Sequence, residues 1–258
     1  MRMLRSRRVV PAAVLLLAAC ETVPYTGRSQ LNLLPEGSEL QMGRQAYAEV
    51  LRQSTINRDP AANGQVEAVG RRIAAATGRT DYQWQFTLIE SQEANAFCLP
   101  GGRVAVYTGI LPITRDEAGL AVVLGHEISH AIAHHGAERL SQSLLIQAGL
   151  AATQIALATG DPATTRQVTS LLGAGAAVGV MLPWSRAQES EADHLGLIFM
   201  AKAGYDPHAA VAFWQRMMQA AKGRRPPEFL SDHPSDETRV RQIEAWIPEA
   251  MGYYRPAS

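Results

Sequence analysis

The stretch "LGHEISHAIAHHG", residues 124–136, contains four of the seven histidines in the chain. It includes an H-E-x-x-H pattern, with His126 and His130 four residues apart, next to the apolar run "LAVVL". On an α-helix four residues advance by about 400°, so the two imidazoles lie about 40° apart on one face. The pattern therefore constrains this part of the chain to a helix that presents two imidazoles to one metal ion.

A glutamate inside the pattern adds chemistry to the two imidazoles. Glu127 follows His126 and can act as the general base for a water molecule at the metal. Zinc suits this set of residues, because imidazole nitrogen is one of its favoured ligands and catalytic zinc sites keep a position open for water or substrate. The sequence therefore predicts one catalytic zinc ion in the chain.

The pattern supplies only two ligands, so a third must come from elsewhere. The metzincin pattern would need glycine at 133 and histidine at 136, but the chain has Ala133 and Gly136. On a continuous helix, His135 would lie about 180° from His126, and His134 would lie about 80° away. Neither can reach the same ion, and both are interpreted as structural.

The segment "ESEADHLG" offers the third ligand. Glu189 and Asp193 stand four residues apart on one helical face. Glu189 can supply a carboxylate oxygen, and Asp193 can accept the far N–H of a ligating histidine and so fix its ring. Glu191 should point away from Glu189, and His194 remains the competing candidate. The alternative is that this segment is only a charged helix face.

H-E-x-x-H followed by E-x-x-x-D resembles the gluzincin metallopeptidases of peptidase family M48, which includes HtpX, the CAAX prenyl protease and the Oma-type proteases. The segments "NAFCLPGGRVAVYTGIL" and "TGRSQLNLL" are similar to those of its small periplasmic lipoprotein members and of the mitochondrial Oma-type proteases. The resemblance spans roughly residues 25–246. It implies an ATP-independent zinc endopeptidase with an α+β, mainly helical, zincin-type domain, in which a small sheet lies beside the active-site helix.

The resemblance also assigns roles residue by residue. The matching zinc ligands and base are His126, His130, Glu189 and Glu127. The segment "HPSDETR" matches a family H-P-x-x-x-x-R element, in which His233 approaches the metal and Arg239 helps to hold the site or the substrate carbonyl. The segment that matches the border of the substrate cleft is Asn95, Ala96 and Phe97. Cys98 follows it, and no catalytic role is inferred for this thiol.

The N-terminus has the pattern of an export signal. Residues 1–19 combine four arginines with a short apolar run, and "LAAC" ends at Cys20 in the manner of a lipobox. We expect cleavage before Cys20 and lipidation of its thiol, with an ordinary signal peptide or an uncleaved anchor as alternatives. Glu21 follows the cysteine where an inner-membrane lipoprotein commonly has aspartate. The expected location is the bacterial cell envelope, facing the periplasm from the outer membrane.

Changes in composition and helix-breaking residues divide the rest of the chain into segments. We expect a lipidated tether and strap over 20–35, a metallopeptidase domain over 36–250 and a tail over 251–258. Within the domain, Thr114 and Glu117 form a capping box that would start the helix of the histidine stretch. The Ala- and Gly-rich segment 141–183 is interpreted as a helical hairpin, with membrane spans as the alternative.

The charge balance does not point to nucleic acid as a partner. Without the four arginines of residues 1–19 the chain has 20 basic and 24 acidic residues, a net charge of −4, which gives no sign of nucleic-acid binding.

The predicted function is zinc-dependent hydrolysis of misfolded or misassembled envelope proteins. The expected partners are these substrates, the membrane through Cys20 and an outer-membrane assembly machinery. The alternatives are a zinc-bearing periplasmic chaperone with little proteolysis and an intramembrane protease.

Overall fold

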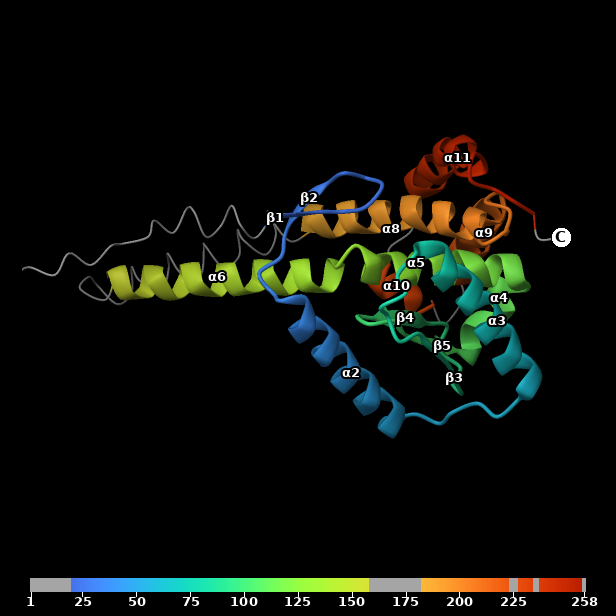
Figure 1. Ribbon diagram of the computed structural model, residues 1–258, viewed down its shortest axis with the longest axis horizontal. Helices are drawn as coiled ribbons and strands as arrows, with labels where there is room; N and C mark the ends of the chain where they lie inside the picture. The colour runs from blue at the N-terminus through green and yellow to red at the C-terminus, as the bar shows by residue number, and fades with distance from the viewer. Residues whose placement is uncertain (1–19, 158–181, 223–226, 234–236, 257–258) are drawn as a thin grey trace, which may run out of the picture.

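Over the residues that the structure describes, the protein is mainly helical, as expected, with a small three-stranded sheet and a separate two-stranded pair (Figure 1). The computed structural model describes residues 20–157, 182–222, 227–233 and 237–256. The strands are β1 (Cys20–Thr22), β2 (Ser29–Leu31), β3 (Gln85–Ile89), β4 (Ala96–Leu99) and β5 (Arg103–Tyr107). The helices are α2 (Glu36–Gln53), α3 (Pro60–Thr77), α4 (Leu111–Thr114), α5 (Glu117–Ile132), α6 (His135–Leu157), α8 (Leu182–Lys202), α9 (Ala209–Ala221), α10 (Phe229–Asp232) and α11 (Glu237–Met251), with a 3₁₀ turn at Thr108–Ile110.

Helix α3 has a clear local signal at each end. The Asp59 side chain accepts a hydrogen bond from the N–H of Ala61 at 2.9 Å, and Pro60 occupies the first turn. Gly78 ends α3 with a φ of 76°, a left-handed conformation that glycine adopts without strain. The capped start and glycine stop therefore fix α3 locally.

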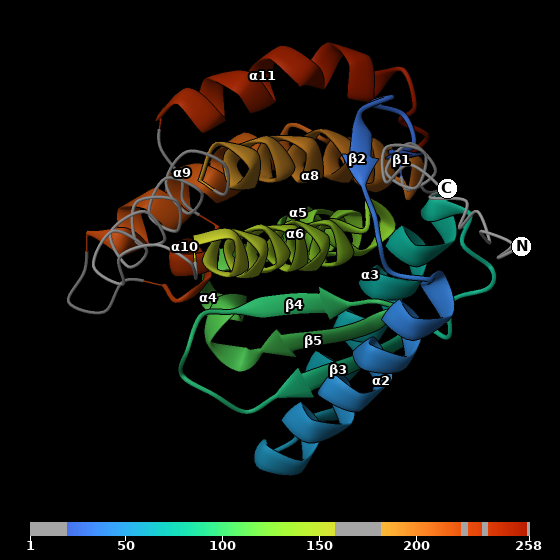
Figure 2. The ribbon, with the colours of Figure 1, turned by 90° about the vertical axis from the view of Figure 1, so that its left-hand side faces the viewer.

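The three-stranded sheet has the order β3-β5-β4, with β3 parallel and β4 antiparallel to β5. The turn between β4 and β5 contains Gly101 and Gly102, whose φ angles are 85° and 80°. Figure 2 shows β4 as the strand nearest to α5 and α6, and α8 and α11 as successive layers above them. The free edge of β4 therefore faces the histidine-bearing helix.

The start of α5 differs from the predicted capping box. Thr114 ends α4, and Arg115 follows with a φ of 69°, which breaks the chain direction. The N-cap of α5 is Asp116, whose side chain accepts a hydrogen bond from the N–H of Gly119 at 2.8 Å. The prediction was wrong because Asp116 can cap the same turn, and aspartate is a stronger N-cap than threonine.

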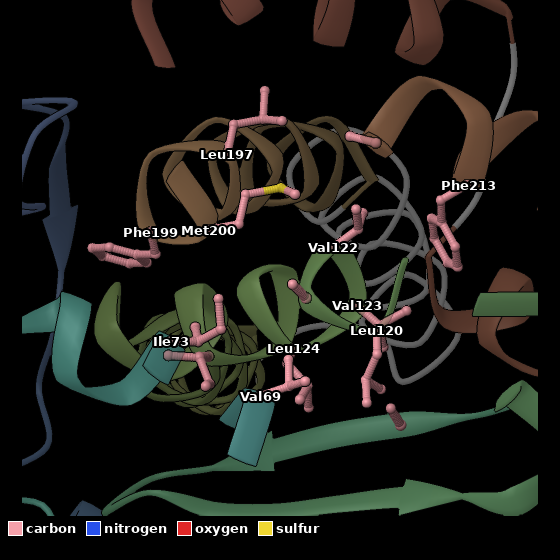
Figure 3. Packing of buried hydrophobic residues seen from close by; sticks show 14 of the residues in the cluster. Val69, Ile73, Leu120, Val122, Val123, Leu124, Leu197, Phe199, Met200 and Phe213 are labelled. Carbon is pink, nitrogen blue, oxygen red and sulfur yellow. The ribbon is translucent and has the colours of Figure 1, made fainter. Parts of the chain in front are cut away.

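Helix α5 runs through the centre of the protein and packs on both α3 and α8. Thirteen of its sixteen residues are buried, so it has no solvent-facing side. Figure 3 shows residues of this core, which include Leu120, Val122 and Leu124 of α5, Val69 and Ile73 of α3, and Leu197, Phe199 and Met200 of α8. The backbones of α5 and α8 meet at Gly125 and Gly196, where a Cβ on Gly196 would lie 3.0 Å from Gly125 C.

The helix of the histidine stretch is not continuous. Helix α5 ends at Ile132, and His134 has a φ of 53°, in the left-handed region. A new helix, α6, begins at His135 and extends away from the sheet (Figure 1). This break changes the direction of the side chains after Ala133, so the helical angles predicted for His134 and His135 do not apply.

The segment before α2 is folded onto the domain. Strands β1 and β2 form an antiparallel pair in which Cys20 lies opposite Leu31. Val23, in the turn between them, is 1% exposed and belongs to the main core. We refer to residues 20–35 as the N-terminal strap, which lies across α6 and α8 (Figure 2).

Some predictions fall on residues that are not described. The signal segment 1–19 lies outside the described residues, as does the part of the expected helical hairpin that spans residues 158–181. Among the helices that the structure does describe, none is both long enough and apolar enough to cross a membrane.

Candidate metal centre

Four side chains from three helices converge on one point. They are His126 and His130 of α5, Glu189 of α8, and His233 at the end of α10. Their possible ligand atoms all lie within 4.8 Å of one another. The fold thus brings Glu189 to the H-E-x-x-H pattern, although 58 residues separate it from His130 in the sequence.

The distances within this group fit a tetrahedral zinc site. The Nε2 atoms of His126 and His130 are 3.1 Å apart, and each lies 3.3 Å from a carboxylate oxygen of Glu189. Two ligand atoms at tetrahedral corners about 2.0–2.1 Å from zinc are about 3.3 Å apart. Imidazole nitrogen and carboxylate oxygen are also donors found in catalytic zinc sites, so these residues fit the ion.

The outer nitrogen of His126 is held by a buried ion pair. Its Nδ1 lies 2.9 Å from Oδ1 of Asp193, which leaves the lone pair of Nε2 facing Glu189. Arg239 donates to both oxygens of Asp193, at 2.7 and 2.8 Å, and its guanidinium lies 3.6 Å from the ring centroid of Trp214. Burial raises the pKa of Asp193, but the charge of Arg239 and the contact with His126 outweigh burial and lower that pKa, so the carboxylate stays ionised.

The electrostatics of the group favour a bound cation. Burial raises the pKa of Glu189, but hydrogen bonds with His126, His130 and His233 outweigh burial and hold that pKa far below its ordinary value. Burial lowers the pKa of His130 well below its ordinary value, which favours the neutral imidazole. Burial also lowers the pKa of His126, but Asp193 and Glu189 outweigh it and raise that pKa. A metal ion at His126 must therefore compete with a proton.

Glu127 and His233 lie beside the ligand group. Glu127 is buried, and its Oε1 lies 3.4 Å from Nε2 of His233. The other ring nitrogen of His233, Nδ1, lies 2.9 Å from Oε2 of Glu189 and 3.1 Å from Nε2 of His126. One imidazole therefore reaches both the candidate ligands and the candidate base.

Four of the seven histidines lie outside this group, among them His134 and His194. His134 pairs with Glu39 of α2, with its Nδ1 2.7 Å from the carboxylate. His194, the competing third ligand, lies with its Nε2 2.8 Å from Glu249 of α11. Glu189 is thus the residue of its segment that reaches the two imidazoles of α5.

Sequence reasoning missed a second set of residues around the centre. His135 lies with its Nδ1 2.8 Å from Nδ1 of His130, and its Nε2 lies 3.0 Å from Glu191. Arg28 of the N-terminal strap binds Glu191 and the fully buried Glu138. No local signal reveals these contacts, because they depend on the break after α5 and on the position of the strap.

The candidate cleft runs beside the edge strand. Asn95 immediately precedes β4, where its carbonyl accepts a hydrogen bond from the N–H of Tyr107 at 3.0 Å, and Ala96 and Phe97 begin the strand. A cavity of about 260 Å³ lies between the end of β4 and the metal centre. Its lining residues include Cys98, Leu99, Pro100, His130, Arg139 and His233. The cavity therefore adjoins the residues that follow the predicted "NAF" segment.

Comparison with known proteins reveals clear relatives. The mitochondrial metalloendopeptidase OMA1 of Schizosaccharomyces pombe is 37% identical over 236 residues, which cover 90% of this chain and 67% of that protein. Human OMA1 is 31% identical over 90% of this chain, and the β-barrel assembly-enhancing protease of Escherichia coli is 29% identical over 86%. The chain spans 46% of the length of each of these last two proteins.

These relatives correct the predicted location. The expectation of a location at the bacterial outer membrane is wrong, because OMA1 proteins from two yeasts, cattle and a plant are named as mitochondrial. The prediction rested on a short leader and on the residue after Cys20. A basic, apolar leader does not by itself specify the membrane to which a chain is directed.

The family model covers most of the domain that carries the centre. The model of Peptidase family M48 matches residues 60–247, which include the sheet, the H-E-x-x-H pattern and the partner glutamate. This match agrees with the convergence of two imidazoles and a carboxylate at one point. The chain therefore belongs to peptidase family M48, a family of zinc metalloproteases.

Proposed function

We propose that His126, His130 and Glu189 hold one zinc ion and that Glu127 is the general base for peptide-bond hydrolysis. Membership of the family makes the chain a metalloendopeptidase, and the proposal concerns which residues do the work. The observation that carries it is the contact of the two imidazole Nε2 atoms with each other, at 3.1 Å, and of each with one carboxylate oxygen of Glu189, at 3.3 Å, beside a buried glutamate.

The mechanism follows from the position of each side chain. A bound zinc ion would supply Lewis-acid chemistry, because it acidifies a water molecule and polarises a peptide carbonyl. Glu127 takes a proton from the attacking water as the water oxygen bonds to the peptide carbonyl carbon, and it passes that proton to the amine nitrogen as the C–N bond breaks. Asp193 accepts hydrogen bonds from Arg239 and keeps the ring of His126 in the orientation that directs Nε2 to the centre. Arg239 therefore has a positioning role.

The substrate segment is proposed to bind in extended form along β4. This strand lies at the edge of the sheet, and backbone groups of an added strand can pair with it whatever their side chains are. Unfolded or misassembled proteins expose such segments. The printed name of the β-barrel assembly-enhancing relative supports this substrate class, and envelope proteins as substrates remain part of the proposal.

The test is removal of the base alone. We expect Glu127→Gln to lower cleavage of an unfolded protein such as casein by at least about 10²-fold, because general-base catalysis contributes about 10²–10⁴-fold. Zinc content and the unfolding midpoint should match the wild type, since glutamine preserves size and Glu127 is not a proposed ligand. Unchanged cleavage would remove Glu127 from the mechanism. A chaperone function, the alternative to proteolysis, would survive this substitution.

We further propose that Cys20 carries a lipid. The support is the "LAAC" stretch, together with the position of Cys20 at the start of β1, where an acyl chain would tie the N-terminal strap to a membrane surface. Metabolic labelling with a palmitate analogue should depend on Cys20 and vanish in Cys20→Ala. Cys98→Ala is the matched control. Labelling that persists in Cys20→Ala would contradict the proposal.

A further inference from the structure

The two proposed ligand histidines are supported in different ways. His126 meets a carboxylate directly, through Asp193 at 2.9 Å. His130 instead meets another imidazole, since its Nδ1 lies 2.8 Å from Nδ1 of His135. His135 is only 1% exposed, and its other nitrogen, Nε2, lies 3.0 Å from Oε2 of Glu191. A buried chain of side chains thus leads away from His130.

The protons in this series of hydrogen bonds have one consistent arrangement. A ligand nitrogen must offer its lone pair, so Nε2 of His130 is unprotonated and Nδ1 carries the proton. Nδ1 of His130 then donates to Nδ1 of His135, which must be an acceptor. The proton of His135 therefore sits on Nε2, and this N–H donates to the carboxylate of Glu191. Each of these two hydrogen bonds therefore contains one proton.

The series of hydrogen-bonded side chains ends in the N-terminal strap. Arg28 donates to Oε2 of Glu191 from Nε at 2.8 Å, and Thr26 donates to the other oxygen from its hydroxyl group. The same guanidinium pairs with Glu138, also at 2.8 Å. The carboxylates of Glu191 and Glu138 are 5% and 0% exposed, so Arg28 is a principal partner of two buried charges. The strap therefore determines where the Glu191 carboxylate lies.

The break between the helices makes these contacts possible. Helix α5 ends at Ile132, and the left-handed backbone of His134 returns the chain so that α6 begins at His135. On a continuous helix His135 would lie about 140° from His130, too far round to touch it. The turn is thus part of the geometry that supports the centre.

We propose that His135, Glu191 and Arg28 are positioning residues that fix the tautomer and ring plane of His130, so that the N-terminal strap sets the zinc affinity of the centre. This inference rests on the proposed function, because it takes His130 to be a zinc ligand. Partners of ligand histidines orient the ring and select the nitrogen that binds the metal. The strap acts on the centre through them without touching the ion.

The first test measures zinc affinity without measuring proteolysis. The full chain is equilibrated with zinc buffered by a series of chelators, and bound zinc is determined by elemental analysis. His135→Leu should raise the zinc Kd by about 10–100-fold, the usual effect of losing such a partner. Arg28→Gln should raise it by up to about 10-fold, because Glu191 stays in place but is less firmly held. His135→Asn should recover part of the affinity, because its amide oxygen can accept from His130.

The matched control is the neighbouring histidine. His134 is also buried and also pairs with a carboxylate, that of Glu39, but it does not touch a proposed ligand. His134→Asn keeps a residue that tolerates the left-handed backbone. Its zinc Kd should equal that of the wild type, even if its unfolding midpoint falls. Equal zinc affinities for His134→Asn and His135→Leu would overturn the proposal.

A second measurement separates this inference from the proposed function. Nitrogen-15 NMR of the zinc-loaded full chain reports which nitrogen of each imidazole carries the proton. We expect His135 to be protonated on Nε2 and to accept on Nδ1. A proton on Nδ1 of His135 would overturn the inference. Full zinc retention by His130→Ala would instead overturn the ligand assignment, which the chelator series on that variant detects.

Discussion

At the scale of single residues, the histidine stretch separates into two pairs. His126 and His130 direct one nitrogen each to the candidate centre, whereas His134 and His135 contact carboxylates with theirs. All four are buried or nearly so, and a buried imidazole needs a partner for each ring nitrogen. The dense cluster of histidines thus reflects one pair at the centre and one pair that ties the surrounding helices together.

His233 gives the sharpest prediction at this scale. Its ring contacts both Glu189 and Glu127, and we propose that it fills space that a water molecule and a substrate carbonyl need. We expect His233→Ala to raise the turnover of a short unstructured peptide, because a blocking side chain is lost. The assay compares the variant and the wild type at equal zinc occupancy.

The opposite result has an equally clear meaning. A fall of about 10²-fold or more would assign His233 as a donor to the developing oxyanion, because loss of one such donor costs about 10²–10³-fold. An unchanged rate would leave His233 as part of the loop alone. Either result would contradict a gating role.

At the scale of elements, the contact between α5 and α8 creates the centre. Gly125 precedes His126, and Gly196 lies one turn beyond Asp193, so the closest backbone approach falls beside the proposed ligands. A Cβ on Gly125 would lie 2.9 Å from the carbonyl oxygen of Gly196. Side chains at these positions would push the helices apart and separate Glu189 from the two imidazoles.

This contact predicts a difference between two glycine substitutions. Gly196→Ala should lower the free energy of unfolding by about 1–3 kcal/mol, the usual cost of overpacking. Gly64→Ala, within α3, is the control, because a Cβ there meets nothing within 4 Å. It should raise stability by about 0.5–1 kcal/mol through helix propensity. Urea denaturation measures both, and a Gly196→Ala protein as stable as the wild type would refute the close contact.

Elements with strong local signals were predictable, and those that depend on unusual backbone were not. The capped start and the glycine stop of α3 are examples of such local signals. The start of α5 and the break before α6 depend on Arg115 and His134, two residues other than glycine with positive φ. Such conformations are stabilised by tertiary contacts, so the local sequence gives no sign of them.

At the scale of the whole molecule, chemistry predicted one long-range contact and missed another. An H-E-x-x-H pattern needs a third ligand, so Glu189 could be proposed across a long separation in sequence. The contact of Arg28 with Glu138 and Glu191 had no such requirement behind it. Charged residues usually face solvent, and only the folded strap shows that these carboxylates are buried.

The central claim is that zinc is held by residues from two helices, and its direct test is zinc content. Purified His130→Ala and Glu189→Ala should each contain almost no zinc by elemental analysis. His194→Ala should contain one zinc per chain like the wild type, because His194 pairs with Glu249 away from the centre. Full zinc in Glu189→Ala together with its loss in His194→Ala would contradict the account.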